Sequence, residues 1–213
     1  MTDRYQTLKT LDELEALYGA PAGAAVTKVV TRLSPLYAKW IAASRFCVLS
    51  TVGPEGTDAS PRGDEGPVVE LLDPATLLLP DWRGNQRIDS LRNIVRDGRA
   101  SLMFLVPGVL EVMRVNGRAE LSTDPALLGR FSDRGRAPKL VLIFHIAEAY
   151  PQCARSLLRS ELWKTGDQRA EVPGMSDFLA EIAAREAGEA AEPVETGRDR
   201  DDEIHRYLGK DMW

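Results

Sequence analysis

Cysteine and histidine are scarce in this sequence of 213 residues, and their scarcity excludes several kinds of site. Cys47 and Cys153 lie too far apart in the chain to indicate a disulfide framework or a close pair of metal ligands. With only His145 and His205 available, a zinc site rich in histidine is not expected either, and we predict no metal. Two isolated thiols suit a reducing compartment, so we expect a cytoplasmic protein.

Long apolar runs and an excess of positive charge are also missing. The longest apolar run, LVLIF at residues 140–144, is far shorter than the roughly 20 residues of a membrane span. The N-terminal segment carries acidic residues and has no apolar core of the kind found in signal peptides. The net charge is −5, whereas proteins that bind nucleic acids or anionic membranes usually carry a surplus of Lys and Arg. We therefore expect neither nucleic acid nor membrane as a partner.

Helical patterns at both ends of the chain flank a middle rich in short strands. The middle holds about six or seven strands, mostly linked as hairpins around turns such as Gly53-Pro54-Glu55-Gly56. One helical segment, NQRIDSLRNIVRDG, connects two of these strands. This order favours an α+β fold, mainly antiparallel β, in which a split β-barrel carries peripheral helices. We divide the chain into an N-terminal helical segment (1–44), a barrel domain (45–165) and C-terminal helices with an acidic linker (166–213).

Local signals set the expected helix boundaries at the two ends. Thr10 and Glu13 form the pattern of a capping box, and Gly19 is expected to end the first helix. A second helix is predicted for residues 24–32, and Pro35 at the first position of a third helix follows Ser34 as its N-cap. The acidic tract at residues 187–202 has the composition of a solvated linker.

Between Trp82 and Arg87 an apolar strand runs into two arginines and two amides, and a helix follows at once. We expect this helix to begin near Gln86. Its first backbone N–H groups would lack internal partners and carry partial positive charge, which an anion can satisfy. Arg87 adds a planar fork suited to phosphate oxygens, and Gly84 lets the backbone turn sharply. The alternative is a solvated helix start in which Asn85 acts as N-cap.

Two further segments strengthen this interpretation. In a strand, Ser60, Arg62 and Asp64 project to one face, and Gly63 permits a flat ligand to approach the backbone. The alternative is an ordinary turn. A later strand, VMRVNGRA, places Arg114 and two other polar residues on one face, which by itself indicates an exposed surface.

Taken together, SPRGD, PDWRGNQRIDSLRNIV and FLVPGVLEVMRVNGRAEL resemble the pyridoxamine 5′-phosphate oxidase-like FMN-binding split-barrel family. The closest likeness is to a branch of mostly unassigned flavoproteins, and it covers about residues 25–165. The chain departs from that branch at Gln152, where relatives tend to have His, and at Trp82-Arg83, where Arg-Pro is more usual. The substrate-binding residues of true pyridoxamine phosphate oxidases find no match here.

The resemblance implies a homodimer that binds FMN in clefts between the two chains. It places the flavin ring beside the SPRGD strand and the phosphate beside the following helix start. The residues expected to bind the cofactor are Ser60, Arg62, Gly63, Asp64, Asp81, Trp82, Asn85, Gln86, Arg87 and Arg114.

The expected function is that of an FMN-dependent oxidoreductase acting on an unknown small molecule through a nicotinamide donor or oxygen. A non-enzymatic flavin carrier or sensor is one alternative, because the fold can hold FMN without a substrate site. A relative that uses haem or a deazaflavin is another, although two histidines offer few axial ligands. No catalytic residue is assigned, since the cofactor carries the redox chemistry. His145 is expected to be a buried or partly buried structural residue, and Cys47 inert packing.

Overall fold

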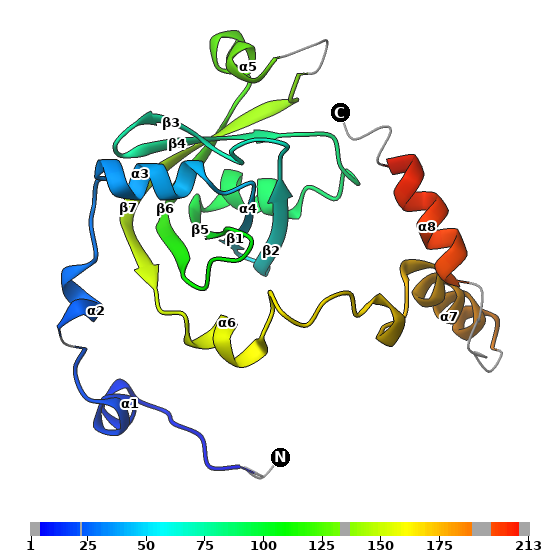
Figure 1. The fold of residues 1–213 in the computed structure, drawn as a ribbon, viewed down its shortest axis with the longest axis horizontal. Coiled ribbons are helices and arrows are strands. Elements are labelled where there is room, and N and C mark those ends of the chain that lie inside the picture. Colours follow the sequence, from blue (N-terminus) through cyan, green and yellow to red (C-terminus); the bar gives the residue numbers. More distant parts are fainter. Residues whose placement is uncertain (1–4, 22, 133–136, 189–196, 209–213) are drawn as a thin grey trace.

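A computed structural model of the chain describes residues 5–21, 23–132, 137–188 and 197–208 (Figure 1). The helices are α1 (Leu11–Tyr18), α2 (Ala24–Thr27), α3 (Pro35–Ala42), α4 (Asp89–Arg96), α5 (Pro125–Phe131), α6 (Arg155–Ser160), α7 (Met175–Ala187) and α8 (Gly197–Leu208), with a 3-10 turn at Arg169–Glu171. The strands are β1 (Phe46–Gly53), β2 (Gly56–Gly63), β3 (Glu70–Asp73), β4 (Thr76–Asp81), β5 (Arg99–Leu105), β6 (Val112–Ser122) and β7 (Leu140–Gln152).

The seven strands form one sheet in the order β2-β1-β5-β6-β7-β4-β3, and each neighbouring pair is antiparallel. The sheet curls without closing, so β2 and β3 remain its edge strands. The predicted α+β split barrel with peripheral helices is confirmed. Hairpins join β1 to β2, β3 to β4 and β5 to β6, while α4 connects β4 to β5, which are not neighbours.

The core lies on the inner face of the curled sheet, where large apolar side chains alternate with outward residues. Phe104 and Phe144 are its largest fully buried members. β6 carries a bulge between Asn116 and Gly117 where it pairs with β7. A Cβ atom on Gly117 would lie 2.0 Å from the His145 carbonyl oxygen, so only glycine fits this close approach.

α4 packs against β1, β2 and β6 and shields one side of the core. Leu91 and Ile94 are buried there, as their helical spacing predicts. Regular helical spacing would place Ile88 and Val95 on the same face, but they are 46% and 74% exposed. Ile88 precedes the helix in a left-handed conformation, which turns its side chain away from the face that Leu91 defines.

Several predicted boundaries need correction. The second helix spans only Ala24–Thr27, because Val30 pairs with Ala149 of β7 in an isolated bridge instead of continuing the helix. α4 begins at Asp89, three residues after the expected start. The acidic tract was expected to be a solvated linker, yet its last part forms the start of α8; residues 189–196 of that tract lie outside the described residues.

The two ends of the described chain contribute little to the barrel core. α1 begins with the predicted capping box, in which Thr10 and Glu13 each bond to the other's backbone, and α1 has no buried residue. α7 and α8 pack against each other, and Asp201 of α8 is buried against the start of α7. None of the described helices is long and apolar enough to cross a membrane.

Candidate functional site

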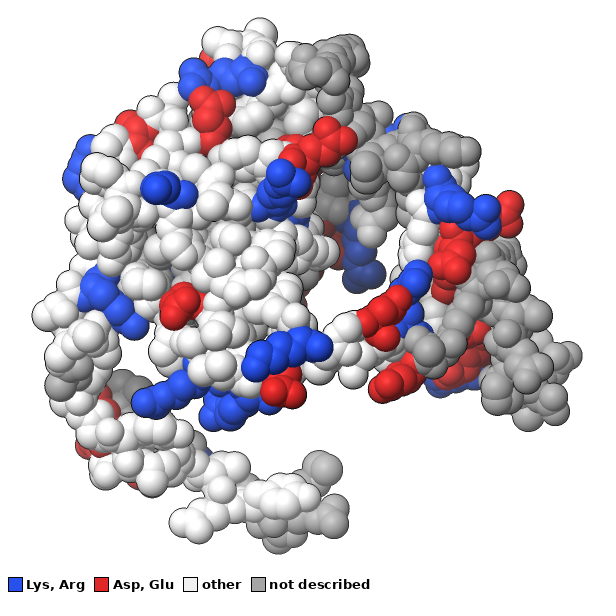
Figure 2. All heavy atoms as spheres, viewed as in Figure 1, with Lys and Arg blue, Asp and Glu red and all other residues white. Residues whose placement is uncertain are grey.

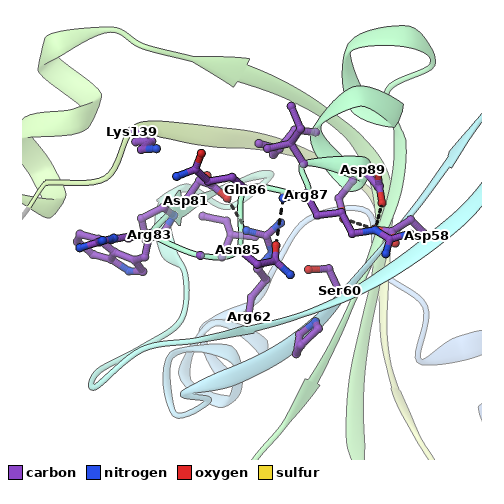
Figure 3. Close-up of a pocket in the computed structure, with 18 of the residues that line it drawn as sticks. Asp58, Ser60, Arg62, Asp81, Arg83, Asn85, Gln86, Arg87, Asp89 and Lys139 are labelled. Carbon is purple, nitrogen blue, oxygen red and sulfur yellow. Dashed lines mark hydrogen bonds and ion pairs between the residues drawn. The ribbon is translucent and has the colours of Figure 1, made fainter. Parts of the chain in front are cut away.

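A cavity of about 490 Å³ lies between β2, the end of β4 and the segment that leads into α4. Figure 3 shows Ser60 and Arg62 reaching it from β2, while Asp81 and Arg83 come from the end of β4 and the loop beyond. Because β2 is an edge strand, one side of its backbone faces away from any strand of the described sheet. The cavity therefore has a wall that offers backbone groups as well as side chains.

Arg62 is a cation of the cavity wall whose side chain is partly buried and held in an ion pair. Its Nη1 donates to Asp81 Oδ1 at 2.5 Å, and the two side chains are only 18% and 15% exposed. Its Nε is buried and has no hydrogen-bond partner within the described part of the protein. Leaving a buried donor of a charged group without an acceptor costs free energy. We therefore expect this nitrogen to donate to an acceptor from outside the described chain.

A second polar bridge lies beside this ion pair. Trp82 Nε1 donates to Asp64 Oδ2 at 2.8 Å, and the Asp64 backbone N–H donates to the Arg45 carbonyl at 3.0 Å. Asp64 follows β2 and Trp82 follows β4, so the two bridges tie together strands from opposite parts of the sheet. This linkage fixes the width of the cavity between them.

The loop before α4 has an unusual backbone. Gln86 and Ile88 adopt φ angles of 60° and 53°, in the left-handed region that non-glycine residues rarely enter. For a β-branched residue such as Ile88 this conformation is strained, and strain of this kind concentrates at functional sites. Asn85 Oδ1 accepts from the Arg87 backbone N–H at 3.1 Å, which closes the turn.

Arg87 lies at the outer part of the cavity wall and is already paired. Its Nε donates to Asp89 Oδ2 at 2.5 Å, and its side chain is 81% exposed. The hydrogen bond from Arg87 lowers the pKa of Asp89 below its usual range. Asp89 occupies the first position of α4, where a carboxylate interacts favourably with the helix dipole. An incoming anion at this point would have to share Arg87 with that carboxylate.

Within the described residues, no side chain caps the first backbone N–H groups of α4. Ile88 is the N-cap and supplies no side-chain hydrogen bond to them. The Ser90 hydroxyl donates to the Asp58 carboxylate of β2 instead of bonding to the helix backbone. The helix thus starts without a side-chain cap, at Asp89 and not at Gln86, and the binding of an anion there stays a prediction.

Eight of the ten residues predicted to bind a cofactor line the cavity. They are Ser60, Arg62, Gly63, Asp81, Trp82, Asn85, Gln86 and Arg87. Asp64 does not line the cavity, but its carboxylate accepts a hydrogen bond from Trp82, which does.

Arg114 is not among the residues that line the cavity. It pairs in register with Met103, which is 38% exposed, whereas Arg62 pairs with the buried Cys47. Arg114 and Arg62 therefore project from opposite faces of the sheet. The Arg114 guanidinium lies 5.3 Å above the Tyr150 ring, and its Nη1 donates to Gln152 Oε1 at 3.3 Å.

The polar residues of the cavity wall that the sequence did not point to include Asp58, Asp89, Ser90 and Lys139. Asp58 precedes Ser60 and Arg62 by steps of two, so strand alternation would have placed it on their face. No local signal points to Lys139, whose segment reaches the cavity because its backbone N–H donates to the Asp81 carbonyl at 3.2 Å.

Other candidate groups lie elsewhere. Within the described residues, no three His, Cys, Asp or Glu side chains gather as metal ligands would. The expectation that His145 is a buried or partly buried structural residue is wrong: the residue is exposed, with 50% of its side chain accessible, and Nε2 lies 2.9 Å from Glu120 Oε1. Cys47 is buried, as its predicted packing role requires, and Cys153 is exposed.

Several solved structures are similar to this chain. The HupZ protein of Group A Streptococcus is 22% identical with a TM-score of 0.45, covering 56% of this chain and 94% of that chain. General Stress Protein 26 of Bacillus anthracis is 18% identical with a TM-score of 0.40, covering 54% and 89%. A protein titled F420 reductase is 17% identical with a TM-score of 0.41, covering 55% and 98%.

Sequence comparison gives a sharper result. No curated protein matches the chain. The family model described as pyridoxamine 5′-phosphate oxidase matches residues 33–153, a span that runs from just before α3 to the end of β7. Because this match covers more than half of the sequence, the chain belongs to the pyridoxamine 5′-phosphate oxidase family.

Proposed function

We propose that the protein is a cytoplasmic FMN-binding flavoprotein, and that it works as an oxidoreductase on a small molecule. The observation that carries this proposal is the buried Nε of Arg62, which faces no acceptor in the described chain although it belongs to a cavity-lining cation. A phosphate or a flavin carbonyl would satisfy it. Membership of a family whose proteins typically bind flavin nucleotides supports the same ligand class.

The cavity residues divide into two groups in this proposal. Arg87, Asn85 and the uncapped N–H groups of α4 would hold the phosphate. Arg62 and Gly63 would line the flavin ring, which supplies the redox chemistry when it is bound. A Cβ atom on Gly63 would meet only the Arg45 carbonyl, at 3.7 Å, so the chain leaves space at this point for a flat ligand.

The proposed working unit is a homodimer with the flavin between the two chains. Proteins of this family are commonly dimers, and here the cavity is bounded by the edge strand β2. Arg114 lies on the opposite face of the sheet from Arg62, so it would reach a flavin only from a second copy. In this arrangement each site uses both copies, and a small-molecule substrate or nicotinamide donor would enter from the solvent side.

A carrier or sensor is the second candidate, and a specific observation favours it. The three aspartates of the cavity wall are all engaged: Asp81 with Arg62, Asp89 with Arg87, and Asp58 with Ser90. A general acid or base needs a titratable group within reach of the substrate. A site whose carboxylates are all engaged within the chain suits binding at least as well as catalysis.

Titration of the purified protein with FMN tests the proposal. We expect a yellow protein that releases FMN on denaturation, and Arg62→Gln should weaken binding by about 1.5–3 kcal/mol, roughly tenfold to a hundredfold in Kd. Asp81→Asn is the matched control, because it breaks the same ion pair but keeps the guanidinium; its loss of affinity should be smaller. Equal FMN affinity in Arg62→Gln and the wild type would contradict the assignment. Consumption of NADH or NADPH by the loaded protein would favour the oxidoreductase over the carrier.

A further inference from the structure

α1 presents an acidic amphipathic surface that nothing in the described chain covers. Its leucines Leu11, Leu14 and Leu17 are 73%, 41% and 68% exposed, and none of its residues is buried. Exposed apolar side chains gathered on one short helix mark an interaction surface more often than a solvated one. The acidic side chains within α1 are Asp12, Glu13 and Glu15, and α1 itself contains no Lys or Arg.

α6 and the turn after it form a basic surface of matching character. Leu158 and Leu162 are 49% and 48% exposed, and Trp163 is 36% exposed while its Nε1 donates to the Val109 carbonyl. Lys and Arg side chains gather at this lower edge of the barrel in Figure 2. The charged residues of the segment 154–166 are Arg155, Arg159, Glu161 and Lys164, three of them basic.

We propose that α1 of one copy docks on the α6 surface of a second copy. The exposed leucines of α1 would pack against Leu158, Leu162 and Trp163. The acidic residues of α1 would face the basic residues of α6, so that the two surfaces match in size, polarity and charge. The proposal concerns surfaces away from the cavity and does not depend on which cofactor that cavity binds.

The N-terminal segment that carries α1 is held against the rest of the chain near Val30. Val30 and Ala149 exchange backbone hydrogen bonds of 2.9 and 2.7 Å, and the Tyr37 hydroxyl donates to the Lys28 carbonyl at 2.6 Å. From Val30 toward the N-terminus, the chain runs outward through α2 to α1, which lies outside the barrel (Figure 1). The leucines of α1 stay exposed although Ala149 lies only six residues before α6, so this chain does not place α1 on its own α6.

α7 is the competing occupant, because it also exposes apolar residues, among them Phe178 and Ile182 at 49% and 52%. Its charges match less well, since Arg185 accompanies its acidic residues. α7 also packs already against α8. The all-acidic α1 is therefore the better complement to α6.

A carbodiimide tests the contact, because it condenses a carboxylate with an adjacent amine and leaves no spacer. We expect a cross-linked peptide that joins Lys164 to Asp12, Glu13 or Glu15, found in the band of doubled mass and missing from the single-chain band. Lys164→Arg keeps the charge but removes the reactive amine, so it should abolish this peptide. Lys39→Arg, on the exposed part of α3, is the matched control and should leave the yield unchanged.

Charge reversal at two other basic residues of α6 provides a second measurement with the same cross-link. Arg155→Glu combined with Arg159→Glu should lower the yield of the cross-linked peptide several-fold, while the far-UV circular dichroism stays the same. The same peptide in the single-chain band would place α1 on its own α6 and overturn the proposal. A link from Lys164 to Asp177 or Glu181 of α7 would assign the surface to α7, and the absence of any link to α1 would also refute it.

Discussion

Cys47 and Cys153 show how strongly burial changes one side chain's chemistry. Burial raises the pKa of the Cys47 thiol to about 12, and Arg62 nearby lowers it only in part. Below that pH the thiol keeps its proton, and thiolate is the reactive form. At pH 8 we therefore expect a disulfide reagent such as Ellman's to modify only Cys153 in the native protein, and both thiols after unfolding in guanidinium. Rapid modification of two thiols in the folded protein would show that Cys47 is accessible.

Gly63 is the residue at which folding and binding can be separated. A new Cβ would meet only one backbone oxygen at ordinary contact distance, and Gly63 is not among the glycines with positive φ. Gly63→Val should therefore leave the unfolding midpoint within a few degrees of the wild type. It should weaken FMN binding, because the added methyl groups occupy the space beside the ring. Parallel thermal melts and FMN titrations check this. A variant that fails to fold would make Gly63 a structural residue.

At the residue scale, side-chain roles that depend on near neighbours in sequence were predicted well. The reciprocal bonds of Thr10 and Glu13 follow from a spacing of three residues. The exposure of His145 was not predicted, because alternation along β7 does not say how far the sheet extends beyond its covered part. The partners of Arg62 and Arg87 depended on the path of the loop between β4 and α4.

Among the elements, α8 is joined to the start of α7 by a buried carboxylate, Asp201. Asp201 Oδ1 accepts from the Ser176 backbone N–H at 3.0 Å and from its hydroxyl at 2.7 Å, and these hydrogen bonds lower the Asp201 pKa. Asp201 thus supplies from α8 the cap that Gly174 cannot give to α7. Asp201→Ala should increase hydrogen exchange across the first turn of α7. Glu203→Ala, an exposed neighbour, should not, and equal exchange in both variants would deny Asp201 this role.

The elements themselves were mostly foreseen, whereas their ends were not. α4 was predicted within the segment 85–98, but its start was placed near Gln86 because the arginines and amides there resemble the first turn of a helix. The left-handed Gln86 and Ile88 delay the helix to Asp89. α2 ends early because a backbone pairing with β7 outweighs its weak helical preference.

For the whole molecule, ligand binding and stability are linked. FMN that binds only the folded state at 100 times its Kd should stabilise the protein by about 2.7 kcal/mol. For a chain of this size that corresponds to roughly 5–10 °C in Tm. Thermal melts with and without FMN measure the shift, and Arg62→Gln at the same FMN concentration should gain less. A melting temperature that does not respond to FMN would contradict binding to the native fold.

Local pattern and composition determined a great deal about this protein. They predicted an α+β split barrel, its flanking helices and eight of the residues that line its cavity, because strand alternation, helical spacing and turn residues act over a few positions. The quoted motifs also pointed to the family that the wider comparison confirms. Tertiary structure alone decided that Asp81 holds Arg62, that Lys139 reaches the cavity and that Arg114 lies on the other face. Those facts depend on which strands become neighbours when the sheet curls, and contacts between residues far apart in sequence leave no local trace.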